Sequence, residues 1–207
     1  MRRTARSLLI LVAATACGRS VTSAPVTAPQ PSVVLAGAPA PLRRTAPRVS
    51  SVEEVDYILQ RGLEIPVAGM TMRDLHDTFD EGRDDSRTHR AMDILAPRGT
   101  AVVAADSGRL IRIGFNALGG NTIYASDPQG RVVYFYAHLD AYQPGLVAGA
   151  AIARGDTLGF VGTTGNAPKD TPHLHFQVMR MSPDGRYWDG EPINPYPLFL
   201  LLNTARP

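Results

Sequence analysis

The segment from residue 171 to residue 178 constrains the fold most strongly, because its polar and apolar residues alternate with the two-residue period of a β-strand. The apolar set is Leu174, Phe176 and Val178, and the polar set is His173, His175 and Gln177. On a strand, the first set would face a core and the second would stand on the open face. Two adjacent imidazoles on one sheet face are either half-exposed polar residues or part of a site. The segment therefore predicts a sheet with one packed face and a candidate site on the other.

Most of the chain after residue 66 has a sequence pattern typical of β-strands. Short apolar runs are separated by Gly, Pro, Asn and Asp, and no segment after Leu63 predicts a long helix. The runs cover residues 101–104, 109–113, 122–125, 131–137, 157–161 and 173–179. This pattern predicts a mainly β fold over residues 66–207, a mostly antiparallel β domain with tight turns.

A short helix is predicted ahead of this domain, over residues 51–65. Ser51 to Glu54 has the composition of a helix start, and apolar residues recur at helical spacing until Gly62 and Pro66 interrupt the pattern. We interpret the apolar stripe as a packing face. The alternative is that the helix lies over the groove and inhibits the site.

The N-terminal segment predicts export. Residues 1–17 combine a basic start with an apolar run that is too short to span a bilayer, so they are typical of a signal peptide. Cys17, the only cysteine, follows Ala14-Thr15-Ala16 as in a bacterial lipobox, so we expect its lipidation; the alternative is cleavage after Ala16. Residues 18–50 are rich in Pro, Ala and Thr and predict a disordered tether. We expect a cell-envelope lipoprotein, or otherwise a periplasmic or secreted protein.

Charge is distributed unevenly along the chain. Seven of the 21 basic residues precede residue 51, whereas all 19 acidic residues follow it, so residues 51–207 carry 14 basic against 19 acidic residues and a net charge of −5. An acidic domain of this kind gives no indication of a nucleic-acid-binding face.

The remaining histidines and one aspartate supply partners for the pair on the strand. His89 lies in a polar loop and Asp93, four residues later, enters a strand. His138 ends the run 132–137, where strict alternation would place it on the face of Val132, Tyr134 and Tyr136. His76 lies in a polar segment and is excluded.

Two histidines and a carboxylate are the ligand set of hydrolytic zinc sites, which leave one position for water. Spacing alone does not say which imidazoles bind a metal. The same set also describes a non-haem iron oxygenase, and single histidines in such places are often only surface residues.

The sequence resembles the M23 peptidases, the LytM and lysostaphin-like peptidoglycan endopeptidases, from about Met70 to Pro197. The resemblance rests on several motifs in one order. They are His89-x-x-x-Asp93 followed by residues 94–100, Ala104 to Gly108, Tyr136 to Leu139, Gly155 to Gly159, Gly162 to Gly165, and His173 to Phe176.

This resemblance implies a compact antiparallel β-sheet domain with a groove that carries the metal site. It implies one Zn²⁺ per domain, held by His89, Asp93 and His175. It implies that His138 and His173 are catalytic and do not bind the metal. The implied function is hydrolysis of peptide cross-links or stems of peptidoglycan by a zinc-bound water. The alternative is a non-catalytic or autoinhibited protein that binds the cell wall and activates another hydrolase, with an unknown protein regulator. Membrane contact is expected only through the lipid anchor.

One segment departs from the family pattern. Residues 77–83 are acidic where many members have a Gly-rich turn. We expect this change to alter the groove rim and to leave the metal site untouched.

Overall fold

The computed structural model of the chain describes residues 51–84 and 87–204. The expected signal peptide, Cys17 and the tether of residues 18–50 lie outside these described residues. Within them, no helix is both long enough and apolar enough to cross a bilayer.

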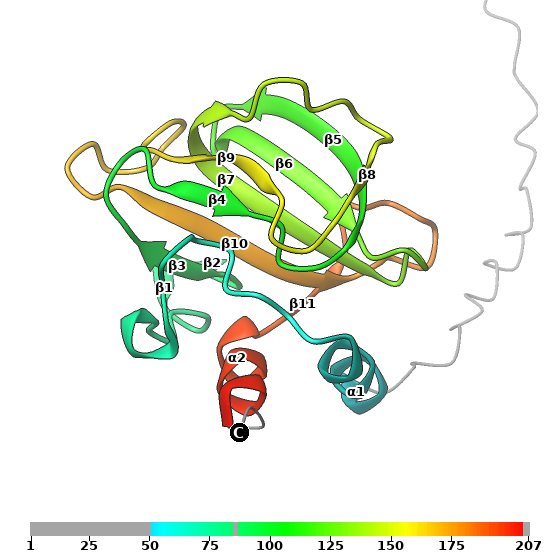
Figure 1. Cartoon of the computed structure of the whole chain (residues 1–207). Coiled ribbons are helices and arrows are strands. Elements are labelled where there is room, and N and C mark those ends of the chain that lie inside the picture. The colour runs from blue at the N-terminus through cyan, green and yellow to red at the C-terminus, as the bar shows by residue number, and fades with distance from the viewer. Residues whose placement is uncertain (1–50, 85–86, 205–207) are drawn as a thin grey trace, which may run out of the picture. The chain divides into compact units, whose positions relative to one another are not determined.

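Antiparallel strands dominate the described part of the chain, as the sequence predicts (Figure 1). Nine described strands form one sheet, in which the order β11-β10-β7-β6-β5-β8 is extended by β3 beside β10, by β9 beside β7 and by β4 beside β9. The sheet strands are β3 (Met92–Leu95), β4 (Ala101–Val103), β5 (Gly108–Asn116), β6 (Gly120–Ser126), β7 (Val132–Tyr142), β8 (Ala151–Ile152), β9 (Thr157–Val161), β10 (His173–Arg180) and β11 (Glu191–Ile193). A separate hairpin contains β1 (Gly82–Asp84) and β2 (Arg87–Thr88).

Strand β10 has the two faces that its alternation predicts. Leu174, Phe176 and Val178 are fully buried in the main hydrophobic core. His175 and Gln177 face the other way and line a groove. Burying three large apolar side chains stabilises the sheet by about 2 kcal/mol each, which fixes which face of β10 is left for a site.

Two helices lie together below the sheet in Figure 1. Helix α1 (Ser51–Arg61) ends four residues earlier than predicted, because Gly62 adopts a φ of +74° and its N–H bonds the carbonyl of Ile58. A short 3₁₀ helix, η1 (Met72–Asp74), follows. Helix α2 (Pro195–Thr204) is not predicted by the sequence. It is apolar on nearly all sides, so it lacks the periodicity by which a surface helix is recognised.

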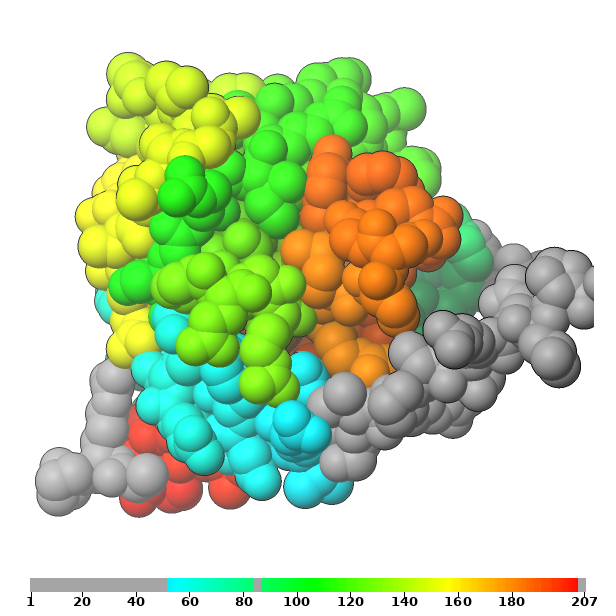
Figure 2. Space-filling model, turned by 90° about the vertical axis from the view of Figure 1, so that its right-hand side faces the viewer, coloured from blue at the N-terminus to red at the C-terminus, as the bar shows by residue number. Residues whose placement is uncertain are grey.

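Helix α1 is attached to the sheet by polar contacts. The Arg61 guanidinium donates to Asp106 at 2.6 Å, and the Tyr57 hydroxyl donates to Asp127 at 2.5 Å. In the space-filling view α1 occupies the lower edge of the domain (Figure 2). None of its residues lines the groove, so the alternative in which α1 covers the candidate site is wrong for this structure.

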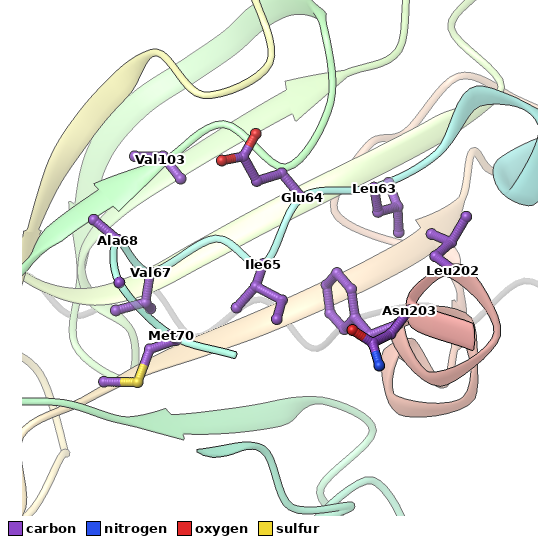
Figure 3. A pocket seen from close by; sticks show the side chains of 11 residues that line it. Leu63, Glu64, Ile65, Val67, Ala68, Met70, Val103, Leu202 and Asn203 are labelled. Carbon is purple, nitrogen blue, oxygen red and sulfur yellow. The ribbon is translucent and has the colours of Figure 1, made fainter. Parts of the chain in front are cut away.

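The segment that links α1 to the domain borders a second hollow, of about 390 Å³ (Figure 3). Residues 63–65 and 67–70 line it together with Val103 and the end of α2. It shares no lining residue with the groove, and Glu64 is the only Asp, Glu, His or Cys among its lining residues. We therefore place the candidate site in the groove.

Candidate metal centre and groove

All five predicted site residues line one open groove of about 550 Å³. They are His89, Asp93, His138, His173 and His175. The groove lies between the β1–β2 hairpin, the start of β10, the middle of β7 and the loop before β10. His76 is exposed and does not contribute to it. The structure therefore brings all five predicted side chains to one place.

Strand pairing brings the first three residues together. Strands β3 and β10 are antiparallel, and their register sets Asp93 directly opposite His175. His89 lies in the loop before β3, four residues ahead of Asp93, as predicted. Directly opposed residues have side chains about 5 Å apart at Cβ, so the pair is fixed by the sheet itself.

The donor atoms of these residues form a nearly equilateral triangle. His89 Nε2 lies 3.0 Å from His175 Nδ1 and 3.0 Å from Asp93 Oδ1, and His175 Nδ1 lies 3.1 Å from Asp93 Oδ1. Ligands of a tetrahedral zinc ion are about 3.3 Å apart, given bond lengths of about 2.0–2.1 Å. The triangle is therefore close to the size that such an ion requires. These three are the group of described residues that meets the geometry of a metal site.

The charges of the three groups also fit a cation. The Nδ1 of His89 lies 2.8 Å from the carbonyl oxygen of Thr78, which can only accept, so Nδ1 carries the proton and Nε2 of the neutral ring has a free lone pair. Burial raises the pKa of Asp93, but the adjoining imidazoles of His175 and His89 outweigh this effect and hold the pKa far below its usual range. An anion and free lone pairs at 3 Å are unfavourable unless positive charge lies beside them, so the donor set suits a divalent metal.

Arg83 supplies positive charge at the same place. Its Nη2 lies 2.6 Å from His89 Nε2 and also contacts the Oδ2 atom of Asp93. Because one lone pair cannot accept this hydrogen bond and bind a metal, Arg83 and a cation compete for His89. Arg83 and Thr78 both belong to residues 77–83. The expectation that this segment leaves the metal site untouched is therefore wrong.

His138 reaches the groove through a β-bulge that the sequence does not predict. Its φ is +61°, and the pairing of β6 with β7 shifts register between Asn121 and Ile123, opposite the bulge. Tyr136 and Leu139 both face the main core, whereas Ala137 and His138 both line the groove. The prediction that His138 shares a face with Val132, Tyr134 and Tyr136 is wrong, because the bulge reverses the alternation.

The two predicted catalytic imidazoles lie beside the triangle. The ring centres of His138 and His173 are 4.9 Å apart, and that of His138 is 5.6 Å from that of His175. His173 Nε2 lies 3.9 Å from Asp93 Oδ1. Both rings therefore adjoin the place where a metal would be held.

Backbone carbonyls orient these two rings in the same way. The Nδ1 of His138 donates to the carbonyl of Thr164 at 2.9 Å, and that of His173 donates to the carbonyl of Thr171 at 2.8 Å. Each neutral ring consequently keeps an unprotonated Nε2. Burial lowers the pKa of His138 from 6.5 to about 4, so its neutral form, which can accept a proton, prevails at neutral pH. Burial also lowers the pKa of His175.

Two close-packed glycines hold the Thr164 loop in place. A Cβ on Gly165, whose φ is +72°, would lie 2.3 Å from the backbone nitrogen of Gly120 and 2.3 Å from the carbonyl oxygen of Leu118. Only glycine permits this approach between the loop and the β5–β6 turn. Thr78 and Thr164 orient His89 and His138 through main-chain oxygens, which every residue possesses. Their role at the site therefore leaves no signal in the sequence.

The fold and the groove define a mainly β protein with a candidate hydrolytic metal centre. Residues 87–195, a little over half of the chain, match the sequence model of Peptidase family M23. The chain belongs to this family.

Individual relatives match the same region. The chain is 32% identical over 99 residues to the L-Ala--D-Glu endopeptidase of Bacillus subtilis, a match covering 45% of this chain and 30% of the relative. It is 29% identical over 93 residues to the peptidoglycan DD-endopeptidase ShyC of Vibrio cholerae, covering 45% and 20%. Lysostaphin of Staphylococcus staphylolyticus is 35% identical over 92 residues, covering 44% and 18%. The matches thus span less than a third of each relative's length.

Solved structures agree with the fold. Lysostaphin from Staphylococcus simulans superposes with a TM-score of 0.52 at 26% identity, covering 65% of this chain and 54% of that chain. Helicobacter pylori Csd3 gives a TM-score of 0.50 at 27% identity, covering 70% and 38%. Both comparisons support the antiparallel fold described above.

Proposed function

We propose that the protein is a zinc metalloendopeptidase that hydrolyses peptide cross-links or stems of bacterial peptidoglycan. Membership of Peptidase family M23 supports peptide hydrolysis. Matches to relatives named as a peptidoglycan DD-endopeptidase and an L-Ala--D-Glu endopeptidase support the substrate class.

His89, Asp93 and His175 would hold the zinc ion, through Nε2, Oδ1 and Nδ1 respectively. Two imidazoles and one carboxylate are a donor set of hydrolytic zinc centres, and three protein ligands leave a position open. When bound, zinc polarises a carbonyl and lowers the pKa of a coordinated water.

His138 and His173 would move the protons of the reaction. Each presents an unprotonated Nε2 to the groove, and a ring that takes up a proton there becomes a donor to the developing oxyanion. The Thr164 and Thr171 carbonyls keep each Nδ1–H occupied, so Nε2 is the nitrogen that acts. Burial keeps the His138 ring unprotonated at neutral pH, so its Nε2 is available to accept a proton.

One observation carries this proposal: five polar side chains from three separate segments, residues 89–93, 138 and 173–175, converge on one groove. Aspartates and histidines that are only surface residues have no reason to lie together in one groove. The convergence also favours catalysis over the non-catalytic alternative, since each predicted position retains a side chain able to perform its role.

The test is digestion of defined muropeptides, read by mass analysis, alongside the metal content of each purified variant. We expect His175→Ala to lose zinc and His173→Ala or His138→Asn to keep it, and all three to lose hydrolysis. His76→Ala, an exposed histidine outside the groove, is the matched control and should behave as wild type. Full cleavage by a zinc-loaded His173→Ala protein would contradict these roles. Elemental analysis after purification without added metal separates zinc from iron.

We also propose that the chain is exported and carries a lipid on Cys17. The support is the lipobox-like Ala14-Thr15-Ala16-Cys17 after a short apolar run. Radiolabelled palmitate should enter the wild type and not Cys17→Ser. Equal labelling of both proteins would refute the anchor.

A further inference from the structure

A continuous row of aromatic rings leads away from the candidate metal centre. The ring of Phe135 lies 6.1 Å from that of His175, and Tyr124 lies 4.4 Å from Phe135. Tyr187 follows at 4.9 Å from Tyr124, and Trp188 at 4.8 Å from Tyr187. Each contact is within the range of favourable aromatic pairs, so the row is one packed feature.

The row passes from the interior to the solvent. Phe135 on β7 is buried and Tyr124 on β6 is half-buried, and both line the groove. Tyr187 and Trp188 belong to residues 181–190, between β10 and β11, and the indole of Trp188 is 57% exposed. The space-filling view shows the orange segment after β10 standing out from the surface (Figure 2).

The exposed end is held by its own loop. Ser182 accepts from the backbone N–H of Arg186 at 3.1 Å, and Asp184 accepts from the Arg186 guanidinium at 2.7 Å. Arg186 also pairs with Asp189 at 3.0 Å. The loop therefore presents Trp188 in a defined position, with charged donors and acceptors beside it.

Packing explains the inner rings but not the outer one. Phe135 belongs to a small apolar cluster with Val133, Ala137 and Met179, against which Tyr124 and Tyr187 pack. Trp188 adds a large ring that the cluster does not bury. Trp188 is joined through Tyr187 to Tyr124, which lines the groove, so a ligand that extends from the groove along this row reaches the exposed ring.

We propose that Tyr187 and Trp188 form a subsite for a sugar ring of the glycan strand, so that the groove prefers peptides still attached to their sugar. This inference rests on the proposed function and specifies its substrate. One face of a pyranose consists of C–H groups, which pack on an indole, while its hydroxyl and acetamido groups need polar partners. Arg186 and Asp189 offer both donors and acceptors there. Because the row of rings joins Trp188 to the groove, one ligand can place its peptide in the groove and its sugar on Trp188.

Trp188 provides its own reporter, since it is the only tryptophan in the chain. The probes are a tetramer of N-acetylglucosamine, a disaccharide-peptide muropeptide, and the same peptide without its sugar. Binding is measured in the presence of EDTA, by tryptophan fluorescence and by calorimetry, so that no probe is hydrolysed.

We expect the tetramer to change Trp188 emission saturably, and the muropeptide to bind about fivefold or more tightly than the free peptide. Tyr187→Ala and Trp188→Ala should abolish that preference, as measured by calorimetry, and leave binding of the free peptide unchanged. Phe115→Ala is the matched control, because Phe115 is 64% exposed and makes no ring contact with the row.

Unchanged emission together with equal affinity for the two peptides would overturn the sugar subsite. If both peptides are nevertheless hydrolysed once zinc is restored, the proposed function stands without it. If neither peptide binds and neither is hydrolysed, both proposals fail.

Discussion

Acid should destabilise the metal-free protein through His138, and the size of the effect follows from its burial. The side chain is only 7% exposed, and burial lowers its pKa from 6.5 to about 4 in the folded state. Between these two pH values the unfolded chain binds a proton that the folded chain does not. Stability contributed by the neutral ring is therefore complete above pH 6.5 and is lost as the pH falls toward 4.

The linkage relation gives the magnitude. For pKa values of 6.5 and about 4, the His138 contribution to the free energy of unfolding falls by at most about 1.3 kcal/mol between pH 7.5 and pH 5.5. The lowered pKa of His175 acts with the same sign. The lowered pKa of Asp93 changes the stability only below about pH 4, so it does not affect the range between pH 7.5 and pH 5.5.

The assay is urea unfolding at pH 7.5, 6.5 and 5.5 with EDTA present, on the wild type and on His138→Asn. Asparagine tolerates a φ of +61° better than most residues, and it has no charge to gain. We expect the variant to lose about 1 kcal/mol less between pH 7.5 and pH 5.5 than the wild type. His76→Asn should keep the wild-type slope, since His76 is exposed. Identical slopes for wild type and His138→Asn would refute the assignment of a buried, neutral His138.

Four further substitutions test the site and the packing of the domain that carries it. Arg83→Gln should bind zinc about tenfold more tightly in a chelator competition, because it removes the group that occupies the His89 lone pair; weaker binding would instead assign Arg83 a supporting role. Gly165→Ala should lower the free energy of unfolding by about 2 kcal/mol or more, because its Cβ would meet backbone atoms at 2.3 Å; a neutral effect in urea unfolding would contradict this packing. Asp106→Ala should lower the free energy of unfolding by about 3 kcal/mol, since it removes the buried carboxylate that pairs with Arg61 and Arg154. Asp140→Ala breaks an exposed ion pair and should lower it by less than about 1 kcal/mol; equal losses would contradict this difference between buried and exposed pairs.

The parts of the fold that could be predicted are those with a local periodic signal. Strand β10 has a two-residue alternation, so its faces follow from the sequence, and the short runs between turn residues mark most of the other strands. The opposition of Asp93 and His175 follows only when strand register is known. Family resemblance, rather than spacing, brings these residues together before the structure does.

The orientation of His138 is a case in which the periodic rule itself fails. A bulge inserts one residue and reverses the faces that follow, and a histidine at positive φ gives no warning in a single sequence. The roles of Thr78 and Thr164 depend on main-chain oxygens, which carry no residue-specific signal. Helix α2 is not predicted because its sequence is apolar throughout, and the helical spacing of apolar residues can be recognised only where polar residues separate them.

The position of α1 limits how this site can be regulated. Arg61 and Tyr57 attach it to Asp106 and Asp127, and Glu54 pairs with Arg131 at 3.0 Å, so successive turns of the helix are tied to the sheet. Because no α1 residue lines the groove, release of the helix would loosen the domain without uncovering the metal centre. Among the described residues, the groove rim is the part that reaches the candidate ligands, because the β1–β2 hairpin presents Arg83 to His89 and Asp93. A change in the position of this hairpin would therefore alter access to the metal centre directly, whereas a movement of α1 would not.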